Sequence, residues 1–525
     1  MKKKILDDVT RQRILKNYTN EKSLVTVQAR RIENHSDELA QILDQYAEEI
    51  GPVLEEYNKT SSRKTMMLMQ NRVSSVRTQN RRIHQDMVEG IAVECAKKLG
   101  LNVGLTRLIA RNHDIGHTFS GHCGENWISD VKARYGLGVF THNSVGPKEL
   151  IYRHRIYDEI MERIQFYNPT IGAGTLDRLR KGLWLIFDGM NSHNGELSEL
   201  EFRPNLGKTE KDFEEEMMGC HTEKGFDRKI VPATIEGCLL RNCDKIAYTP
   251  FDMVDGLNEG IIDGIGGEYV DVLTSLGISK EEINEANVRR QYEKIARKLQ
   301  IIFARSLIEH SSKSVITMEP NVCRLMHEMR NINNREVVNF QLIQEDGATY
   351  PKAIDILANG FAELIQTGIG FNSLRYMSEN LELARQVITR YQGTQYEDFA
   401  VYIAGTTPEM YNFNSKMIER IAEQNGEELS DQEYKRRMAL EFGLNYMATL
   451  SDEEFMNLMV THGLVADGEK KSLTRSYREL GRERLMKEQS VHENWKKISA
   501  EQAAETAKMG SAGHNAPGED DEETR

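Results

Sequence analysis

The densest cluster of chemically versatile side chains in this sequence lies between residues 113 and 142. Four of the 14 histidines fall in this window, where even spacing along 525 residues would place about one. The window opens with HDIGHTFSGHCGE, which runs from His113 to Glu125. Because imidazole rings bind metal ions and exchange protons near neutral pH, this window predicts a metal site, a proton-transfer site or both.

Three further positions complete a set of metal-ligating residue types. His84 lies upstream, Asp114 follows His113 directly and Asp244 lies downstream, which gives the order H…HD…D. Two imidazoles and two carboxylates form a mixed nitrogen and oxygen site, which suits Mn, Fe, Co, Ni or Zn and also admits Mg. Four protein ligands leave two positions of an octahedral ion open, for a water and a phosphoryl oxygen. We therefore expect a divalent metal cofactor, with Mn, Mg, Fe and Co as the candidates.

Helices are the elements expected to position these residues. Few runs alternate as strands do, so the predicted fold class is all-α. Apolar residues recur at helical spacing over Ile83–Leu99, and Gly100 follows as a stop signal. Gly104–Asn112 is expected to form a short helix that ends directly before His113.

A third helix is expected to start at Pro232 and to carry Asp244. On that helix Asp244, Tyr248 and Asp252 are spaced i, i+4 and i+8, so they share one face. Pro250 should bend or end the helix, because proline lacks the N–H that a helix interior uses. Surface loops are expected at 207–216 and 346–350, where charged and small residues gather.

We expect an N-terminal helical segment over residues 1–60 and a catalytic core over 61–330. A C-terminal helical region over 331–505 and a disordered acidic tail over 506–525 are expected to follow. The side chains of this tail are mostly small, polar or acidic, as its last stretch, GSAGHNAPGEDDEETR, shows.

Composition limits the classes of partner and compartment. The chain is 39% hydrophobic and carries a net charge of −13, which argues against bulk binding to nucleic acid or anionic membranes. No apolar run approaches the roughly 18 residues that span a bilayer, and MKKKILDDVT lacks the apolar stretch of a secretory signal. Six cysteines without a CxxC pair fit a reducing compartment. We therefore expect a cytoplasmic protein without membrane association.

A local cluster of positive charge is the exception to this acidic balance. Four arginines lie within eleven residues, at Arg72, Arg77, Arg81 and Arg82. They are expected to form a phosphate-facing wall of the active site. An effector site for a nucleotide, or a groove for single-stranded nucleic acid, is the alternative, although few aromatic residues are interleaved for base stacking.

The stretch His113–Glu125 resembles the HD-domain metal-dependent phosphohydrolases, and within them the deoxynucleoside triphosphate triphosphohydrolases typified by the bacterial dGTP enzymes. The resemblance also rests on RRIH ending at His84, on THN around His142, on SHNGE around His193 and on the segment from Asp244 to Asp252. It covers roughly residues 70–260. It implies an HD-domain helical core over 61–330 and assigns the metal ligands as His84, His113, Asp114 and Asp244.

The same resemblance implies roles for the other residues. His122 and Glu125 would be the catalytic pair, with the carboxylate orienting the imidazole as it exchanges a proton. His117, grouped with the catalytic residues, would contact the phosphates. The remaining substrate-binding residues would be Arg81, His142, Lys245, Tyr248, Asp252 and His193. Among these, Tyr248 would pack against the deoxyribose and exclude a 2′-hydroxyl, and Asp252 would accept from the 3′-hydroxyl.

These features predict an enzyme that hydrolyses a deoxynucleoside triphosphate to a deoxynucleoside and tripolyphosphate, which would lower or balance the dNTP pools. A homo-oligomer with nucleotide-controlled activity is expected from the same resemblance. Two alternatives stay open: another HD-domain phosphohydrolase, such as a nucleotidase or phosphodiesterase, and a metal-bearing nucleotide sensor or single-stranded nucleic-acid binder.

Overall fold

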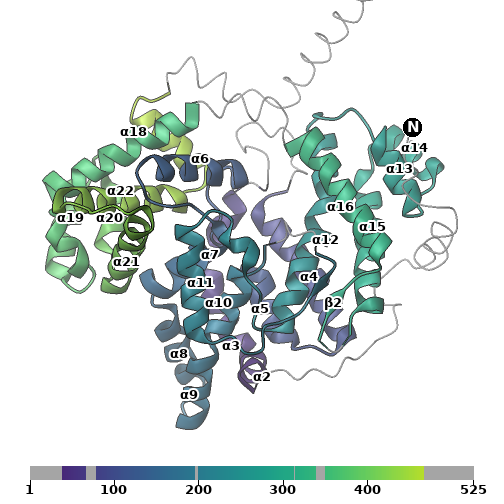
Figure 1. The fold of residues 1–525 in the computed structure, drawn as a ribbon, viewed down its shortest axis with the longest axis horizontal. Helices are drawn as coiled ribbons and strands as arrows, with labels where there is room; N and C mark the ends of the chain where they lie inside the picture. Colours follow the sequence, from purple (N-terminus) through teal and green to yellow (C-terminus); the bar gives the residue numbers. More distant parts are fainter. Residues whose placement is uncertain are drawn as a thin grey trace, which may run out of the picture.

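The computed structural model describes residues 38–64, 66, 79–194, 199–312, 314–338 and 349–465. The described residues are almost entirely helical, which confirms the all-α prediction (Figure 1). Their two short strands, β1 (Glu201–Phe202) and β2 (Ile316–Thr317), pair antiparallel, with Glu201 opposite Thr317. No described helix is long and apolar enough to cross a membrane.

The helices form two groups that follow one another along the chain. The symbol η marks a short 3-10 or π helix. The first group is α2 (Glu38–Gln45), α3 (Ala47–Tyr57), η2 (Lys59–Arg63), α4 (Arg81–Leu99), α5 (Val103–Asn112), α6 (Gly121–Arg134), α7 (His142–Lys148), η4 (Glu149–Arg153), α8 (Ile156–Tyr167), α9 (Ala173–Gly182), α10 (Trp184–Asn191), α11 (Glu210–Thr222), η5 (Phe226–Lys229), α12 (Ile235–Asn258), α13 (Glu268–Ser275), α14 (Lys280–Arg289), α15 (Tyr292–His310), α16 (Pro320–Asn333) and η6 (Asn334–Val338). The second is α18 (Thr349–Leu364), η8 (Ile365–Ile369), η9 (Phe371–Tyr376), α19 (Leu381–Tyr391), α20 (Glu397–Ala404), α21 (Pro408–Asn425), α22 (Asp431–Thr449) and α23 (Asp452–Thr461).

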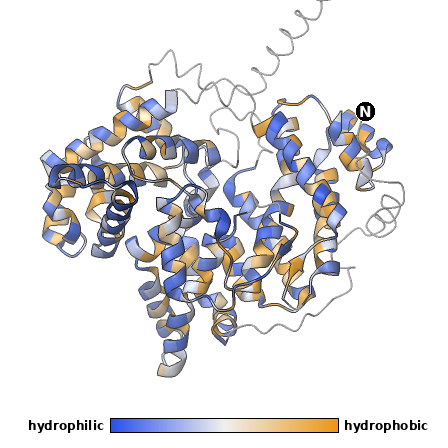
Figure 2. Ribbon diagram, in the orientation of Figure 1, coloured by the Kyte–Doolittle hydropathy of each residue, from blue (hydrophilic) through white to orange (hydrophobic). Residues whose placement is uncertain are grey.

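Hydrophobic burial divides these helices into two main cores. One core lies among α2–α5, α10, α12, α15 and α16. The other joins the second group of helices to α6, whose Trp127 stacks on Tyr350 of α18 with ring centroids 4.5 Å apart. Figure 1 shows α6 lying with α18 and α22 rather than with α12 and α15. Figure 2 shows hydrophobic and hydrophilic residues interleaved along the same helices, as expected of amphipathic helices that bury one face.

The two predicted helices around the histidine window are confirmed. Helix α4 begins after Asn80, whose side chain accepts the Ile83 N–H, and it ends at Gly100 with φ of 75°. That left-handed conformation is one that glycine adopts without a steric cost. Helix α5 ends at Asn112, so His113 and Asp114 lie in the turn directly after it.

Of the two outcomes predicted at Pro250, a bend or an end of the third helix, the structure excludes the end. Helix α12 begins at Ile235, behind an N-cap at Thr234, and continues past Pro250 to Asn258. Proline in a helix interior costs about 3 kcal/mol. The turns beyond it bury Met253, Val254 and other side chains, and α12 packs along α4, α15 and α16, so burial outweighs the lost hydrogen bond.

The loop predicted at 207–216 is largely helix. Helix α11 begins at Glu210, and Thr209 and Asp212 form a capping box at its start. Phe213 and Met217, one turn apart, are buried, so the charged residues cover the outer face of an amphipathic helix.

The second predicted loop, 346–350, is helical at Thr349 and Tyr350, which begin α18, while 346–348 lie outside the described residues. Also outside are Arg72 and Arg77, residues 1–37 of the N-terminal segment and the whole predicted tail 506–525.

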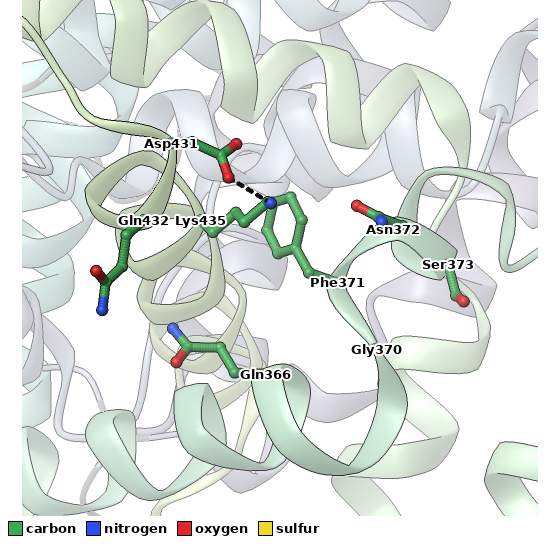
Figure 3. Close-up of a pocket in the computed structure, with 8 residues that line it drawn as sticks. All are labelled: Gln366, Gly370, Phe371, Asn372, Ser373, Asp431, Gln432 and Lys435. Carbon is green, nitrogen blue, oxygen red and sulfur yellow. Dashed lines mark hydrogen bonds and ion pairs between the residues drawn. The ribbon is translucent and has the colours of Figure 1, made fainter.

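A surface pocket lies in the second group of helices, between η9 and the start of α22 (Figure 3). Phe371 and Lys435 both line it, and Lys435 pairs with Asp431. Its lining includes none of the residues singled out in the sequence, so the candidate site is elsewhere.

Candidate metal centre and active site

The four predicted metal ligands come together from three packed elements. His84 lies in the first turn of α4, His113 and Asp114 follow α5, and Asp244 lies near the middle of α12. Helix α4 packs against both α5 and α12. The four side chains are buried, with Asp244 the most exposed of them at 10%. Residues 160 positions apart in the sequence are therefore adjacent in the fold.

The distances among these side chains are those of one compact cluster. Asp244 Oδ1 lies 3.0 Å from His84 Nε2 and 3.8 Å from His113 Nε2. Asp114 places Oδ2 3.6 Å from His84 Nε2 and Oδ1 3.4 Å from His113 Nε2. Both carboxylates thus face both imidazoles.

The hydrogen bonds of His113 fit a metal ligand. Its Nδ1 lies 2.7 Å from the carbonyl oxygen of Ala110, so Nδ1 carries the proton and Nε2 presents a lone pair. Nε2 is buried and has no hydrogen-bond partner among the described residues. A metal-ligating histidine usually donates its other N–H to an oxygen in this way. The buried cluster formed by His84, His113 and Asp114 could therefore hold a metal ion.

Neighbouring imidazoles, with Arg81 beside Asp114, hold the pKa values of the two carboxyl groups low despite their burial. Burial raises the pKa of Asp114, but His113, His117 and Arg81 outweigh it and hold that pKa well below its usual value. Burial likewise raises the pKa of Asp244, and His84 and His113 lower it overall. Ionised carboxylates are the form that binds a cation.

Arg81 is buried beside this cluster. Its Nη1 donates to Asp114 Oδ2 at 2.9 Å and its Nη2 donates to the Met66 carbonyl at 2.6 Å. Both terminal nitrogens of the guanidinium group are therefore engaged with the protein. The predicted contact between Arg81 and a phosphate stays a prediction.

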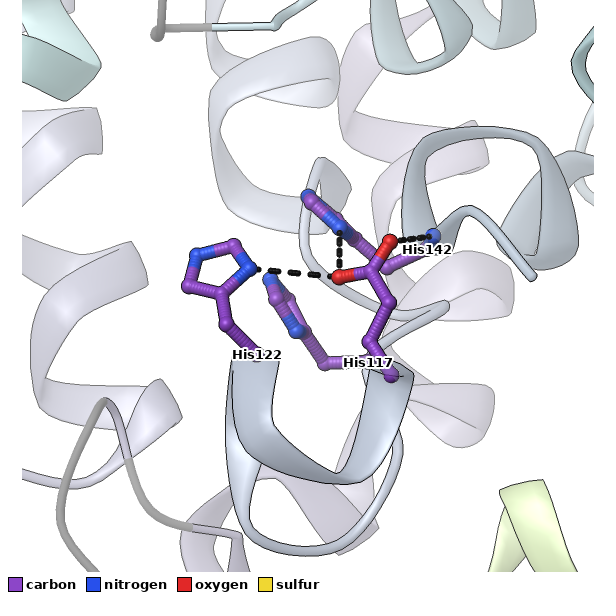
Figure 4. Close-up of side chains that lie close together, drawn as sticks. His117, His122 and His142 are labelled. Atoms are coloured by element: carbon purple, nitrogen blue, oxygen red, sulfur yellow. Dashed lines mark hydrogen bonds and ion pairs between the residues drawn. The ribbon is translucent and has the colours of Figure 1, made fainter. Parts of the chain in front are cut away.

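A second cluster lies beside the first, at the start of α6. Figure 4 shows the rings of His117, His122 and His142 gathered there. Glu125 Oε2 accepts from His142 Nδ1 at 2.9 Å and from His122 Nδ1 at 3.2 Å, and its Oε1 accepts from the His142 backbone N–H at 3.1 Å. Glu125 thus fixes the orientation of two imidazoles, including the predicted catalytic partner.

The second cluster runs from the interior to solvent. The side chain of His117 is 1% exposed, that of Glu125 is 14% exposed and that of His122 is 49% exposed. His117 stacks on His142 with centroids 3.7 Å apart. Burial raises the pKa of Glu125, but His142 and His122 outweigh it and hold this pKa well below its usual value. A carboxylate of low pKa therefore orients an imidazole that solvent can reach.

The turn before His122 is held by the C-terminal helices. Ser120 and Gly121 both have φ of 54°, and a Cβ at Gly121 would lie 2.3 Å from the Met66 carbonyl oxygen. The Ser120 N–H donates to Asp452 Oδ1 of α23 at 2.8 Å, and Phe455 stacks on Phe119 at 3.6 Å. Sequence reasoning missed Asp452 and Phe455. Their helix start was readable from the capping box of Ser451 and Glu454, but the contact was not.

Known proteins resemble this chain over part of its length. It is 29% identical over 264 residues to the deoxyguanosinetriphosphate triphosphohydrolase-like protein of Geobacter metallireducens, a match that covers 49% of this chain and 56% of that protein. The protein of the same name in Geobacter sulfurreducens is 30% identical, over 34% of this chain and 36% of that protein. The one in Bartonella quintana is 27% identical, over 49% of this chain and 58% of that protein. No family model matches the chain. The matches therefore cover at most 58% of the length of these curated relatives. At 27–30% identity, the relationship is distant.

The predicted sugar-binding residues lie further along α12. Tyr248 is half-buried and packs with the small cluster of Met66, Ile261 and Val337. Asp252 is half-buried, and burial raises the pKa of this carboxyl to about 7, against the opposing effect of His122 and Arg81. The sugar contacts predicted for Tyr248 and Asp252 stay predictions.

Lys245 and His193 are both fully buried, in different surroundings. Lys245 Nζ lies 4.7 Å from the centroid of the Phe202 ring in β1, and burial lowers its pKa to about 8. His193 faces the first cluster, with Nε2 3.6 Å from Asp114 Oδ1. Burial, with His113 and His142, lowers the pKa of His193 to about 3. The substrate contacts predicted for these two residues stay predictions.

Proposed function

We propose that this chain is a metal-dependent phosphohydrolase that converts a deoxynucleoside triphosphate to a deoxynucleoside and tripolyphosphate. The observation that carries the proposal is the adjacency of the two clusters. Asp114 Oδ1 lies 3.4 Å from His113 Nε2 in the first cluster and 3.3 Å from His117 Nε2 in the second. A phosphate held by the second cluster would therefore lie beside the ion held by the first. The names of the distant relatives supply the substrate class.

His84, His113, Asp114 and Asp244 would hold the ion. When bound, the divalent ion supplies Lewis-acid stabilisation of the negative charge on the α-phosphate. Manganese, magnesium, iron and cobalt all suit this mixed set of nitrogen and oxygen ligands. Arg81, through its ion pair with Asp114, would keep that carboxylate ionised and oriented.

His122 would be the group that moves protons. Its Nδ1 donates to Glu125 Oε2 and its side chain is half-exposed, so Nε2 would exchange a proton at the exposed end of the cluster. In the hydrolysis, the oxygen of a water forms a bond to the α-phosphorus while the bond from that phosphorus to O5′ breaks. The water gives a proton to His122 Nε2, and the imidazolium so formed gives a proton to O5′ as it leaves.

The other predicted residues complete the proposal. His117 and His142 would contact the triphosphate, with Lys245 as a further candidate. Tyr248 would pack against the deoxyribose, and Asp252 would accept from its 3′-hydroxyl. A homo-oligomer that responds to nucleotides, in a cytoplasmic setting, belongs to the same proposal.

Product analysis tests the reaction. The purified chain is incubated with each of the four dNTPs and Mn²⁺, and the phosphate products are separated by anion exchange. Tripolyphosphate released in step with deoxynucleoside supports the proposal. Release of orthophosphate or pyrophosphate instead would assign the site to a different phosphohydrolase reaction.

The metal ligands have their own test. Asp244→Ala should lose bound metal and activity while it keeps its helical content, and His122→Ala should lose activity but keep its metal. A protein that keeps full metal stoichiometry after Asp244→Ala would contradict the ligand assignment.

A further inference from the structure

A buried lysine contacts the turn that leads to His122. Lys64 directly follows η2 and is 4% exposed. Its Nζ donates to the carbonyl oxygen of His117, where this turn begins. A buried polar group is costly unless it is hydrogen-bonded, and a buried charge more so. The contact with His117 therefore fixes both the lysine side chain and the start of the turn.

The backbone around Lys64 also holds Arg81. The Lys64 carbonyl accepts the Arg81 backbone N–H at 3.0 Å, and the Met66 carbonyl accepts from Arg81 Nη2 at 2.6 Å. Arg81 in turn pairs with Asp114 at 2.9 Å. The short segment of Lys64 and Met66 is therefore joined to the first cluster through Arg81 and to the second cluster through His117.

The turn depends on such contacts because part of its backbone is strained. Ser120 has a positive φ of 54°, a conformation that a non-glycine residue keeps only where its surroundings impose it. Lys64 anchors the turn at the His117 carbonyl, and Asp452 of α23 anchors it at the Ser120 N–H. The first anchor acts on His117 itself, and the second acts two residues before His122.

A direct contact between Lys64 and a substrate is not supported. Its Nζ is bonded to a backbone carbonyl, and its side chain is buried. Burial lowers the pKa of Lys64 to about 8, an effect that Asp452 and Glu454 oppose. A neutral amine still has N–H groups to donate, so the contact with His117 does not require the charged form.

We propose that Lys64 is a positioning residue, which holds the His117 backbone so that the His117 ring, stacked on His142 at 3.7 Å, can contact the triphosphate. The inference deepens the proposed function and rests on it for its catalytic meaning. Loss of the Lys64 anchor should weaken triphosphate binding more than turnover. Loss of the Asp452 anchor should do the reverse, because it acts beside His122.

Lys64→Met removes the donor and keeps an unbranched side chain in the buried space. Hydrogen–deuterium exchange of the full chain, read by mass spectrometry without nucleotide, should become faster over residues 113–125. With dGTP and Mn²⁺, kcat/KM should fall by roughly 10- to 150-fold, the range for one hydrogen bond to a charged group. Most of this decrease should appear in KM, and bound metal should not change.

The matched control is Arg63→Gln. Arg63 precedes Lys64 and pairs with Glu454 of α23 at 2.9 Å, but this pair is largely exposed. An exposed pair contributes little, so this variant should leave both the exchange and KM unchanged. Should Lys64→Met fail to fold, Lys64→Gln, whose side chain is one atom shorter than lysine, is measured instead and should show the same changes in smaller measure.

Unchanged exchange over residues 113–125 in the Lys64 variant would overturn the inference. The same split between KM and kcat in Lys64→Met and Asp452→Ala would also overturn it, as would an equal effect of Arg63→Gln. Faster exchange in the Lys64 variant alone, in a chain that hydrolyses no dNTP, would support the anchor and overturn the proposed function.

Discussion

The contact between Asp452 and Ser120 gives a quantitative test of how the turn before His122 is held. Ser120 is a non-glycine residue with φ of 54°, a conformation that costs about 1–2 kcal/mol. A hydrogen bond to a charged acceptor contributes about 1.5–3 kcal/mol, and Asp452 accepts the Ser120 N–H at 2.8 Å. This hydrogen bond is therefore large enough to decide whether the turn keeps the shape that presents His122.

Asp452→Ala should release the turn and lower kcat. Because about 1.4 kcal/mol corresponds to a factor of ten in rate, the loss of this bond predicts a decrease of roughly 10- to 150-fold, the upper figure being a limit. KM should change less, since His117 and His142, the histidines proposed to contact the triphosphate, stay in place. Bound metal should be unchanged, because the Ser120 N–H that Asp452 accepts is not part of the four predicted metal ligands. Steady-state kinetics on dGTP, with metal content and Tm measured in parallel, check this.

Two companion variants separate positioning from general destabilisation. Asp452→Asn keeps an acceptor oxygen and should retain most of kcat. Ser120→Gly removes the steric cost of positive φ, so Asp452→Ala should cost less in that background. Equal losses in Asp452→Ala and Asp452→Asn, or the same loss in both Ser120 backgrounds, would refute the reasoning.

Three further predictions address the ion pairs, the pH dependence and the sugar. Glu441→Gln leaves Lys132 buried without the carboxylate that lies 2.9 Å away. This should cost about 3–5 kcal/mol in urea unfolding, and the double variant Lys132→Met with Glu441→Leu should recover part of it; a cost below about 1 kcal/mol would be inconsistent with a buried pair. Burial raises the pKa of Asp252 to about 7, so the folded chain binds this proton more tightly than the unfolded chain does. The stability that this proton contributes is fully present below about pH 4 and is lost as the pH rises through 7. Asp252→Asn should therefore raise Tm at pH 8 more than at pH 4.5, and equal shifts at both would argue against the raised pKa. Tyr248→Ala should narrow the ratio of dGTP to GTP turnover, and an unchanged ratio would remove Tyr248 from sugar selection.

Local sequence signals were sufficient for the elements that carry the predicted ligands. The apolar stripe from Ile83 and the stop at Gly100 define α4, and the order H…HD…D correctly anticipates that His84, His113, Asp114 and Asp244 meet. The capping pair Thr209 and Asp212 would also have revealed α11, had the charged residues not suggested a loop.

Other features depend on packing that no local pattern records. The helix through Pro250 survives because the turns beyond it are buried. The ion pair of Arg81 with Asp114 and the approach of His193 to His142 follow from how α4, α10 and the turn after α5 meet. Asp452 lies 332 residues from Ser120, a separation at which only the completed fold brings two side chains together.

The buried pair of Lys132 with Glu441 has a consequence for dissecting this molecule. Lys132 lies on α6 and Lys148 on α7, the helices that begin at the second histidine cluster, and Lys148 Nζ also lies 3.9 Å from Glu441 of α22. A fragment lacking the helices after residue 338 would leave both ammonium groups without this carboxylate and expose Trp127 and Phe140 to water. The histidine-bearing part is therefore not a separable module, and excised fragments are poor material for enzymology or crystallisation.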